Sequence, residues 1–201
     1  MLVLPEVKLP KDAVRLCLGA GETPFDDYQN FDFFSVHENV TQCDLRRLPF
    51  EDNSVDEIFA LQPEHIPHPE ILTTFTEWLR VLKPNGYFSM NFPDFVWVMK
   101  NWLELPEEER WGYKFGVIFG MQNTPCDVHY TGFTKERAIE LLTTAGFSEV
   151  RAEFRDQFDH QRVWAFARKP MQPNTSSTNE NLAGSVLPAA MLSTKLFYDS
   201  K

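Results

Sequence analysis

The sequence predicts an α/β fold, in which helices cover a mostly parallel β-sheet. Between residues 13 and 170, short apolar runs alternate with segments of helical periodicity. The run that ends at Leu18 is followed by Gly19, as expected for a buried strand that enters a turn. The length of 201 residues and the hydrophobic content of 43% suit one domain with a substantial core.

Seven short apolar segments are predicted as strands, in chain order. They are Val14–Leu18, Gln29–Phe33, Val40–Cys43, Asp56–Ala60, Tyr87–Phe92, Val150–Phe154 and Val163–Ala167.

Two helices are marked by residues typical of helix ends. The first opens at Pro69, where a missing N–H costs least, and Pro84 stops it. The second begins at Thr134, a good N-cap, and ends at Gly146. A third helix is predicted from Asp94 to Glu104.

The rest of the chain is predicted to be irregular or to lie outside the main domain. Residues 105–132 are rich in Trp, Phe and Gly and are expected to be irregular. We expect the domain to span residues 1–170 and a linker and C-terminal tail to span 171–201. The tail is expected to pack on the domain or on a neighbouring subunit, or to be floppy. Oligomeric state stays open.

Composition excludes several classes of function. A net charge of −10 and a pI near 5.0 argue against nucleic-acid binding. No apolar run approaches the roughly 18 residues of a membrane span, and the first nine residues lack the pattern of a signal peptide. Three cysteines without a CxxC pair argue against a disulfide framework or a zinc site and favour the cytoplasm. No metal site is expected.

Three sequence features predict a nucleotide-like ligand at the carboxyl ends of neighbouring strands. Gly19-Ala20-Gly21 follows the first strand, and Asp32 ends the second, where a carboxylate can accept bonds from two ribose hydroxyls. Asp44, after the third strand, is placed to accept a bond from an adenine amino group, with Leu45 as a wall for the ring. Each feature alone has an ordinary structural explanation, but their coincidence favours a ligand site.

At this point several motifs resemble class I S-adenosylmethionine-dependent methyltransferases. Residues 16–24 (LCLGAGETP) resemble the first motif, and residues 28–32 (YQNFD) resemble a motif of a small bacterial and phage-type branch. Residues 43–58 (CDLRRLPFEDNSVDEI) are similar to the CDL…LPFxDNSVDEI block of that branch. Residues 64–69 (EHIPHP) and 78–86 (WLRVLKPNG) extend the resemblance, which covers about residues 13–170.

The resemblance implies a three-layer Rossmann-like methyltransferase fold, with a seven-stranded, mostly parallel sheet and an antiparallel last strand. It implies S-adenosylmethionine as the cofactor, with Gly19 and Gly21 against its methionine part, Asp32 on the ribose, and Asp44 and Leu45 at the adenine. The full set of implied cofactor-binding residues is Leu18, Gly19, Ala20, Gly21, Asp32, Asp44, Leu45 and Gln62.

The sequence departs from the family pattern in two places. Only 11 residues separate Gly21 from Asp32, so the usual long first helix is expected to be short or missing. Gln62-Pro63 replaces a normally apolar pair beside the transferred methyl group, which puts the reaction centre in question.

We therefore predict a methyltransferase that acts on a small-molecule acceptor. His65 is the leading candidate for a catalytic base, ahead of His68, His129 and Asp94, and each has a structural alternative, such as an N-cap role for Asp94. Five aromatic residues are expected to form either a lid or part of a core; they are Trp97, Trp102, Trp111, Phe115 and Phe119.

Two other functions compete with this prediction. The first is a protein that binds S-adenosylmethionine or S-adenosylhomocysteine but is catalytically impaired, as a sensor or assembly subunit. The second is a Rossmann-type oxidoreductase, which ranks last because residues 19–24 lack the third glycine of a dinucleotide site.

Overall fold

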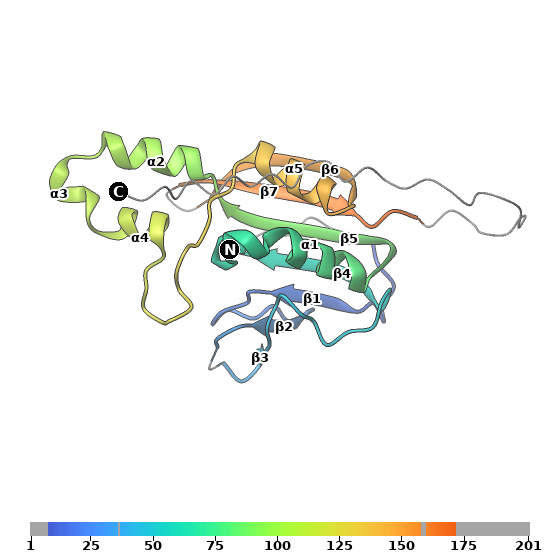
Figure 1. Ribbon diagram of the computed structural model, residues 1–201. Coiled ribbons are helices and arrows are strands. Elements are labelled where there is room, and N and C mark those ends of the chain that lie inside the picture. Colours follow the sequence, from blue (N-terminus) through green and yellow to red (C-terminus); the bar gives the residue numbers. More distant parts are fainter. Residues whose placement is uncertain (1–7, 36, 158–159, 172–201) are drawn as a thin grey trace, which may run out of the picture. The chain divides into compact units, whose positions relative to one another are not determined.

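The computed structural model describes residues 8–35, 37–157 and 160–171, and it contains a seven-stranded sheet (Figure 1). The strand order is β3-β2-β1-β4-β5-β7-β6, and β7 runs antiparallel to both of its neighbours while the other pairs are parallel. The strands are β1 (Arg15–Leu18), β2 (Gln29–Asp32), β3 (Thr41–Gln42), β4 (Val55–Leu61), β5 (Leu82–Pro93), β6 (Ser148–Gln157) and β7 (His160–Arg168). The predicted fold class is confirmed.

All seven predicted strands are present, although the bounds of each differ from the predicted ones, most of all at β5, β6 and β7. β5 begins at Leu82, five residues earlier than predicted, because Leu82 pairs with Val55 before a register shift in the β4–β5 ladder. β3 keeps only two residues, both exposed, at the edge of the sheet. The predicted linker and tail lie outside the described residues, except for Met171.

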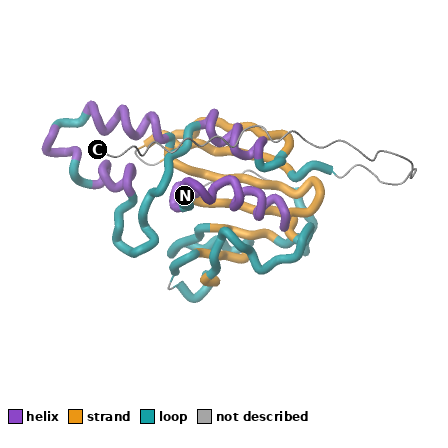
Figure 2. Tube along the Cα trace, viewed as in Figure 1, coloured by secondary structure: helices purple, strands orange, loops and turns teal. Residues whose placement is uncertain are grey.

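The three predicted helices are present (Figure 2), but the first begins at Ile71 instead of Pro69 and ends at Val81, and Pro84 lies within β5. Two short 3₁₀ helices, η1 (Pro63–His65) and η2 (His68–Glu70), precede α1 (Ile71–Val81), so Pro69 lies in η2. Asp94 caps α2 (Phe95–Glu104) by accepting a bond from the Trp97 amide at 2.6 Å. Thr134 caps α5 (Lys135–Thr144). Of the two roles considered for Asp94, base or N-cap, the structure shows the N-cap.

The segment predicted to be irregular, residues 105–132, contains two short helices, which corrects the expectation. They are α3 (Glu107–Arg110) and α4 (Tyr113–Phe119). A chain of aromatic contacts joins Trp102 to Trp111, Trp111 to Phe115 and Phe115 to Phe119, with ring centroids 4.7–5.7 Å apart. These contacts pack α2 against α4, and sequence periodicity does not reveal them because each helix is too short.

The two faces of the sheet are packed differently. Alternate strand residues, such as Leu16, Ile58 and Phe88, join the core cluster that α1 and α5 cover. The intervening residues face the other way, where Phe59 stacks on Trp164 with ring centroids 5.4 Å apart. No helix of the described chain contributes to this second cluster. The predicted absence of a long helix between β1 and β2 is thereby confirmed.

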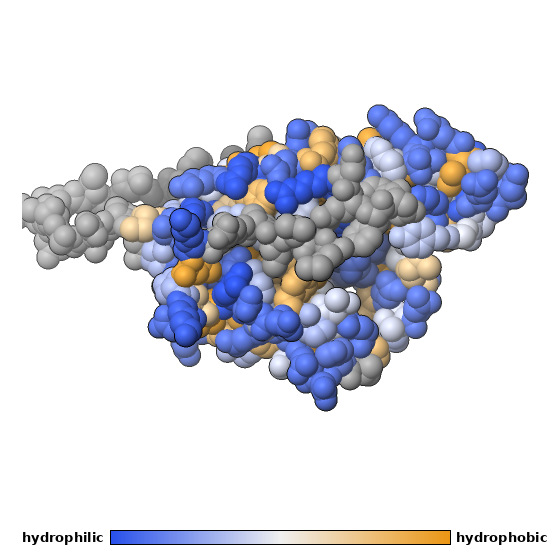
Figure 3. Space-filling view, turned by 180° about the vertical axis from the view of Figure 1, so that it is seen from behind, coloured by the Kyte–Doolittle hydropathy of each residue, from blue (hydrophilic) through white to orange (hydrophobic). Residues whose placement is uncertain are grey.

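A buried ionic network supports the second face. The Glu57 side chain accepts bonds from Arg15 Nε at 2.6 Å and from the Tyr28 hydroxyl at 2.9 Å. Glu57 is buried, and Tyr28 comes from the segment that replaces the helix. Seen from behind, the described surface mixes hydrophilic and hydrophobic residues (Figure 3).

Candidate cofactor site

The carboxyl ends of β1, β2 and β4 point to the same edge of the sheet, where ligands bind in open α/β folds (Figure 1). A cavity of about 570 Å³ opens at this edge. Eight of the nine predicted site residues line it; they are Leu18, Gly19, Gly21, Asp32, Asp44, Leu45, Gln62 and His65. The ninth, Ala20, is buried in the cluster on the second face of the sheet.

Gly19 and Gly21 form a tight turn at the end of β1. Gly19 has a φ of +80°, and a Cβ there would lie 2.6 Å from the Leu61 carbonyl oxygen, so the turn packs directly against the end of β4. Gly21 has a φ of +55°, and a Cβ there would meet no atom within 4 Å. This second glycine therefore leaves bare backbone at the cavity wall, where a ligand can approach closely.

Asp32 is fixed by two backbone amides. Its Oδ2 accepts a bond from the Gly21 amide at 2.8 Å, and its Oδ1 accepts one from the Phe34 amide at 2.9 Å. Each carboxylate oxygen can accept more than one bond, so both can still accept from a ligand hydroxyl. The carboxylate is thus held in place before any ligand binds.

Asp44 is paired with a neighbouring arginine. Arg46 donates from Nε and Nη2 to the two carboxylate oxygens of Asp44, at 2.8 Å each, and it also reaches Glu70 at 2.6 Å. These hydrogen bonds lower the pKa of the Asp44 carboxyl below its ordinary value. An adenine amino group at Asp44 would therefore share oxygens that already accept from Arg46.

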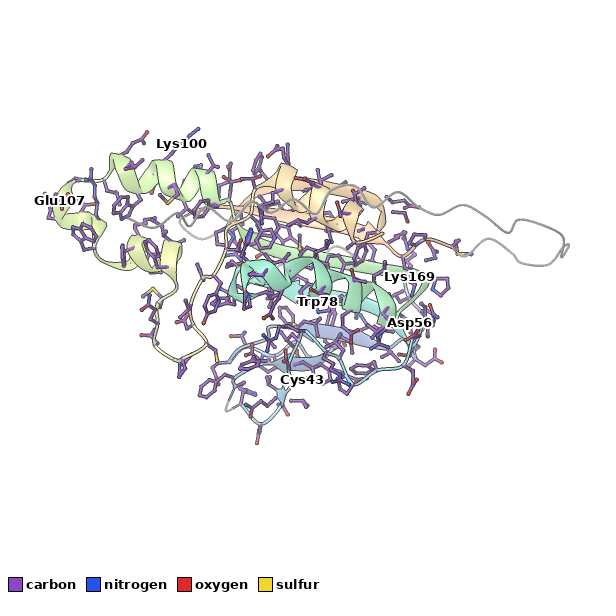
Figure 4. The ribbon with its side chains drawn as sticks, in the orientation of Figure 1. Cys43, Asp56, Trp78, Lys100, Glu107 and Lys169 are labelled. Atoms are coloured by element: carbon purple, nitrogen blue, oxygen red, sulfur yellow. The ribbon has the colours of Figure 1, made fainter. Side chains whose placement is uncertain are left out.

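Trp78 of α1 fixes the segment that carries Asp44 and Leu45. Its Nε1 donates to the Leu45 carbonyl oxygen at 2.8 Å, and the indole also lines the cavity. Figure 4 labels Trp78 on α1 and Cys43 near β3. It also labels Asp56 in β4, Lys169 directly after β7, Lys100 in α2 and Glu107 in α3. The sequence places Trp78 on the buried face of its helix but does not reveal its contact with the site.

Gln62 and His65 lie at the end of β4. Gln62 adopts a left-handed backbone conformation, with φ 51° and ψ 55°, which is uncommon for a residue other than glycine. Its amide donates to the Asn91 carbonyl at 3.1 Å. His65 Nδ1 lies 3.2 Å from the Cys126 carbonyl oxygen, which ties η1 to the loop before α5.

That loop supplies the opposite wall of the cavity, which the sequence does not predict. Thr124, Cys126, Asp127 and Tyr130 line the cavity from the connection between α4 and α5. None of the aromatic residues proposed for a lid is among the described residues that line it.

Phe33 and Phe34 also line the cavity, and they are 47% and 42% exposed. The sequence signal that could have identified this part of the wall is the pair of consecutive phenylalanines directly after Asp32.

His68 does not line this cavity; its ring nitrogen contacts Thr131 and Arg137 instead. His129 lines a much smaller neighbouring cavity, beside Glu64.

We compared the sequence and the fold with those of known proteins. Residues 29–86 match the family model described as a methyltransferase domain. This segment is similar to methyltransferase domains, and the strand order of the sheet is that of the class I methyltransferase fold. The predicted family, the enzyme class and the cofactor, S-adenosylmethionine, are confirmed by this match together with the sheet topology. No curated protein matches the sequence significantly.

Solved methyltransferases share the fold at low sequence identity. A SAM-dependent methyltransferase of Methanosarcina mazei is 16% identical, with a TM-score of 0.60, over 82% of this chain and 95% of that one. One from Thermotoga maritima is 15% identical, with a TM-score of 0.54, over 80% and 84% of the two chains. Phosphoethanolamine N-methyltransferase 2 of Haemonchus contortus, in complex with S-adenosyl-L-methionine, is 17% identical, with a TM-score of 0.53, over 81% and 50%.

No helix of the described residues is both long and apolar enough to cross a membrane. The three cysteines, Cys17, Cys43 and Cys126, are all free thiols.

Proposed function

We propose that this protein transfers a methyl group from S-adenosylmethionine to a small molecule that enters the cavity beside residues 124–130. The observation that supports this most is that one cavity holds both the predicted cofactor residues and a second wall from a distant segment. Its volume of about 570 Å³ lies in the range of small-molecule sites, roughly 300–1,000 Å³.

The residues at the three strand ends fit an adenosine group. Asp32 presents a fixed carboxylate with free acceptor capacity, which suits two ribose hydroxyls. Gly21 offers bare backbone to the methionine part, and Leu45 offers an apolar surface to the adenine. The bound cofactor would supply an electrophilic methyl group, and the protein would supply alignment, which is worth roughly 7–11 kcal/mol in favourable cases.

We assign His65 the role of a base for an acceptor that must lose a proton. A carbonyl oxygen only accepts, so the contact with Cys126 requires the hydrogen of His65 to sit on Nδ1. Nε2 then carries a lone pair that can take the acceptor's proton as the acceptor atom bonds to the methyl carbon and the carbon–sulfur electron pair returns to sulfur.

One feature favours the alternative of a binding protein. The polar side chain of Gln62, held on a strained backbone, lines the cavity where the family has an apolar residue. If this residue obstructs the acceptor, the protein would retain cofactor affinity without turnover.

Two measurements distinguish these functions. The first is calorimetry with S-adenosylhomocysteine, and the second is transfer of a labelled methyl group to pooled metabolites. We expect binding in the first and label in at least one pool in the second, and we expect His65→Gln to lose most of the transfer while keeping cofactor affinity. His37→Gln is the matched control, because His37 does not line the cavity.

Failure to bind S-adenosylhomocysteine would refute both functions. Binding without transfer to any pool would support the binding protein. We also place the enzyme in the cytoplasm, because three free thiols suit a reducing compartment.

A further inference from the structure

Behind His65 lies a cluster of metal-ligating side chains that the methyl-transfer reaction leaves unexplained. Glu64 and His65 belong to η1, and His129 belongs to the connection between α4 and α5. One ligand atom from each of the three lies within 4.8 Å of the others. Backbone bonds fix the arrangement, because the Glu64 carbonyl accepts from the Tyr130 amide at 2.9 Å, directly after His129.

The Glu64 carboxylate is buried without a hydrogen-bond partner. The residue is 3% exposed, and within the described part of the chain neither Oε1 nor Oε2 has a partner. Burying a carboxylate in this way is costly unless a cation or a proton compensates it. Arg162 acts on Glu64 electrostatically, but its Nε donates to Asn91 Oδ1 at 2.6 Å rather than to the carboxylate.

Both histidines are oriented as metal ligands usually are. His65 uses Nδ1 at the Cys126 carbonyl, and His129 contacts the Ile118 carbonyl through its ring. Each imidazole has a second nitrogen for a ligand bond, and at His65 the carbonyl partner leaves Nε2 as that nitrogen. The two rings lie edge to face, with centroids 4.6 Å apart.

We propose that Glu64, His65 and His129 bind a divalent transition-metal ion, with Zn²⁺ the best match. Two imidazoles and one carboxylate form a ligand set of catalytic zinc sites and leave at least one coordination position open. Ligand atoms of a tetrahedral zinc ion lie about 3.3 Å apart, so small side-chain rotations would close the cluster around the ion.

The open coordination position would face the cofactor cavity, because His65 lines that cavity while Glu64 and His129 lie behind it. An acceptor hydroxyl or a water bound there would lose its proton more readily. His65 would then serve as a metal ligand instead of a base. The metal site requires only these three residues, so a failure of the proposed methyl transfer would not disprove the metal site.

The test measures metal binding by the full chain after dialysis against a chelator. Calorimetry with Zn²⁺ alone should show one site per chain, and Co²⁺ should give the visible absorption of a four-coordinate complex. Mg²⁺ should not compete, because it prefers oxygen ligands. We expect Glu64→Gln and His129→Gln each to weaken Zn²⁺ binding by at least about 100-fold, since each removes a ligand.

His37→Gln is the matched control and should bind Zn²⁺ like the wild type. Glu64→Gln is nearly isosteric and removes a buried charge, so we expect it to fold, and thermal unfolding verifies this for every variant. Wild-type protein that binds no Zn²⁺ would overturn the proposal, as would Zn²⁺ binding that both variants retain. Loss of Zn²⁺ binding with S-adenosylhomocysteine affinity intact would support the metal site separately from the cofactor site.

Discussion

Replacing Asp32 tests the most defined contact proposed for the cofactor. In the free protein its two carboxylate oxygens each accept one backbone amide, from Gly21 and Phe34. Bound to S-adenosylhomocysteine, the same oxygens would also accept from the two ribose hydroxyls. Asp32→Ala removes all four bonds, whereas Asp32→Asn keeps one oxygen that can accept.

The size of the effect follows from these bonds. A hydrogen bond to a charged group contributes about 1.5–3 kcal/mol, so two ribose bonds would contribute about 3–6 kcal/mol. Because each oxygen already accepts from an amide, we take the lower end, about 3 kcal/mol, which corresponds to roughly 100-fold in affinity. Asp32→Asn should lose about half of this, or roughly tenfold.

Calorimetry with S-adenosylhomocysteine measures these ratios, and urea unfolding measures the accompanying stability loss. We expect Asp32→Ala to lose about 1–3 kcal/mol of unfolding free energy, since two amides lose their acceptor. Asp26→Asn is the matched control, because Asp26 is an exposed carboxylate on the same β1–β2 connection that does not line the cavity. Folded Asp32→Ala with wild-type affinity would refute the ribose assignment.

Three further predictions concern stability and reactivity. Gly19→Ala should lose at least about 2 kcal/mol in urea unfolding, because its left-handed backbone costs about 1–2 kcal/mol and its Cβ meets the Leu61 carbonyl. Hydrogen bonds from Arg80 lower the pKa of Glu77, so Glu77 stabilises the fold above its ordinary pKa of 4.5, and that stability is lost as the pH falls through the lowered value. Glu77→Gln should therefore cost about 1 kcal/mol near pH 7 and progressively less in acid. Burial raises the pKa of the Cys17 thiol to about 12, so iodoacetamide should label Cys17 only after denaturation.

Each of these predictions has an internal control. Gly21→Ala shares the left-handed backbone without the clash, so equal losses at Gly19 and Gly21 would contradict the close contact with Leu61. For Glu77, the exposed Glu51→Gln should show no pH-dependent difference, and a Glu77→Gln cost that persists unchanged in acid would contradict the linkage. Rapid labelling of Cys17 in the native protein would contradict its burial.

The sequence predicts the fold and one side of the site because their determinants are local. The turn at Gly19 and Gly21 and the carboxylate at Asp32 sit at strand ends, and strand ends are visible as the points where apolar runs stop. Parallel topology then brings these residues together without further information. The caps at Asp94 and Thr134 are predicted for the same reason, since a cap acts within three residues of its own position.

The other side of the site depends on contacts between distant segments. Cys126 lines the cavity because its carbonyl meets His65, 61 residues away in sequence. The Tyr130 amide binds the Glu64 carbonyl over a similar separation. No periodicity or motif marks residues 120–131, so the sequence offers no basis for placing them. A motif match does not reveal the ion pair of Asp44 and Arg46, because that pair depends on side-chain geometry.

The two walls of the cavity come from separate segments of the chain. Residues 18–78 supply the strand ends and the tryptophan on one side, and the stretch between α4 and α5 supplies the other. A change in the length or sequence of that stretch would therefore reshape one wall while leaving the strand-end residues of the other wall unchanged.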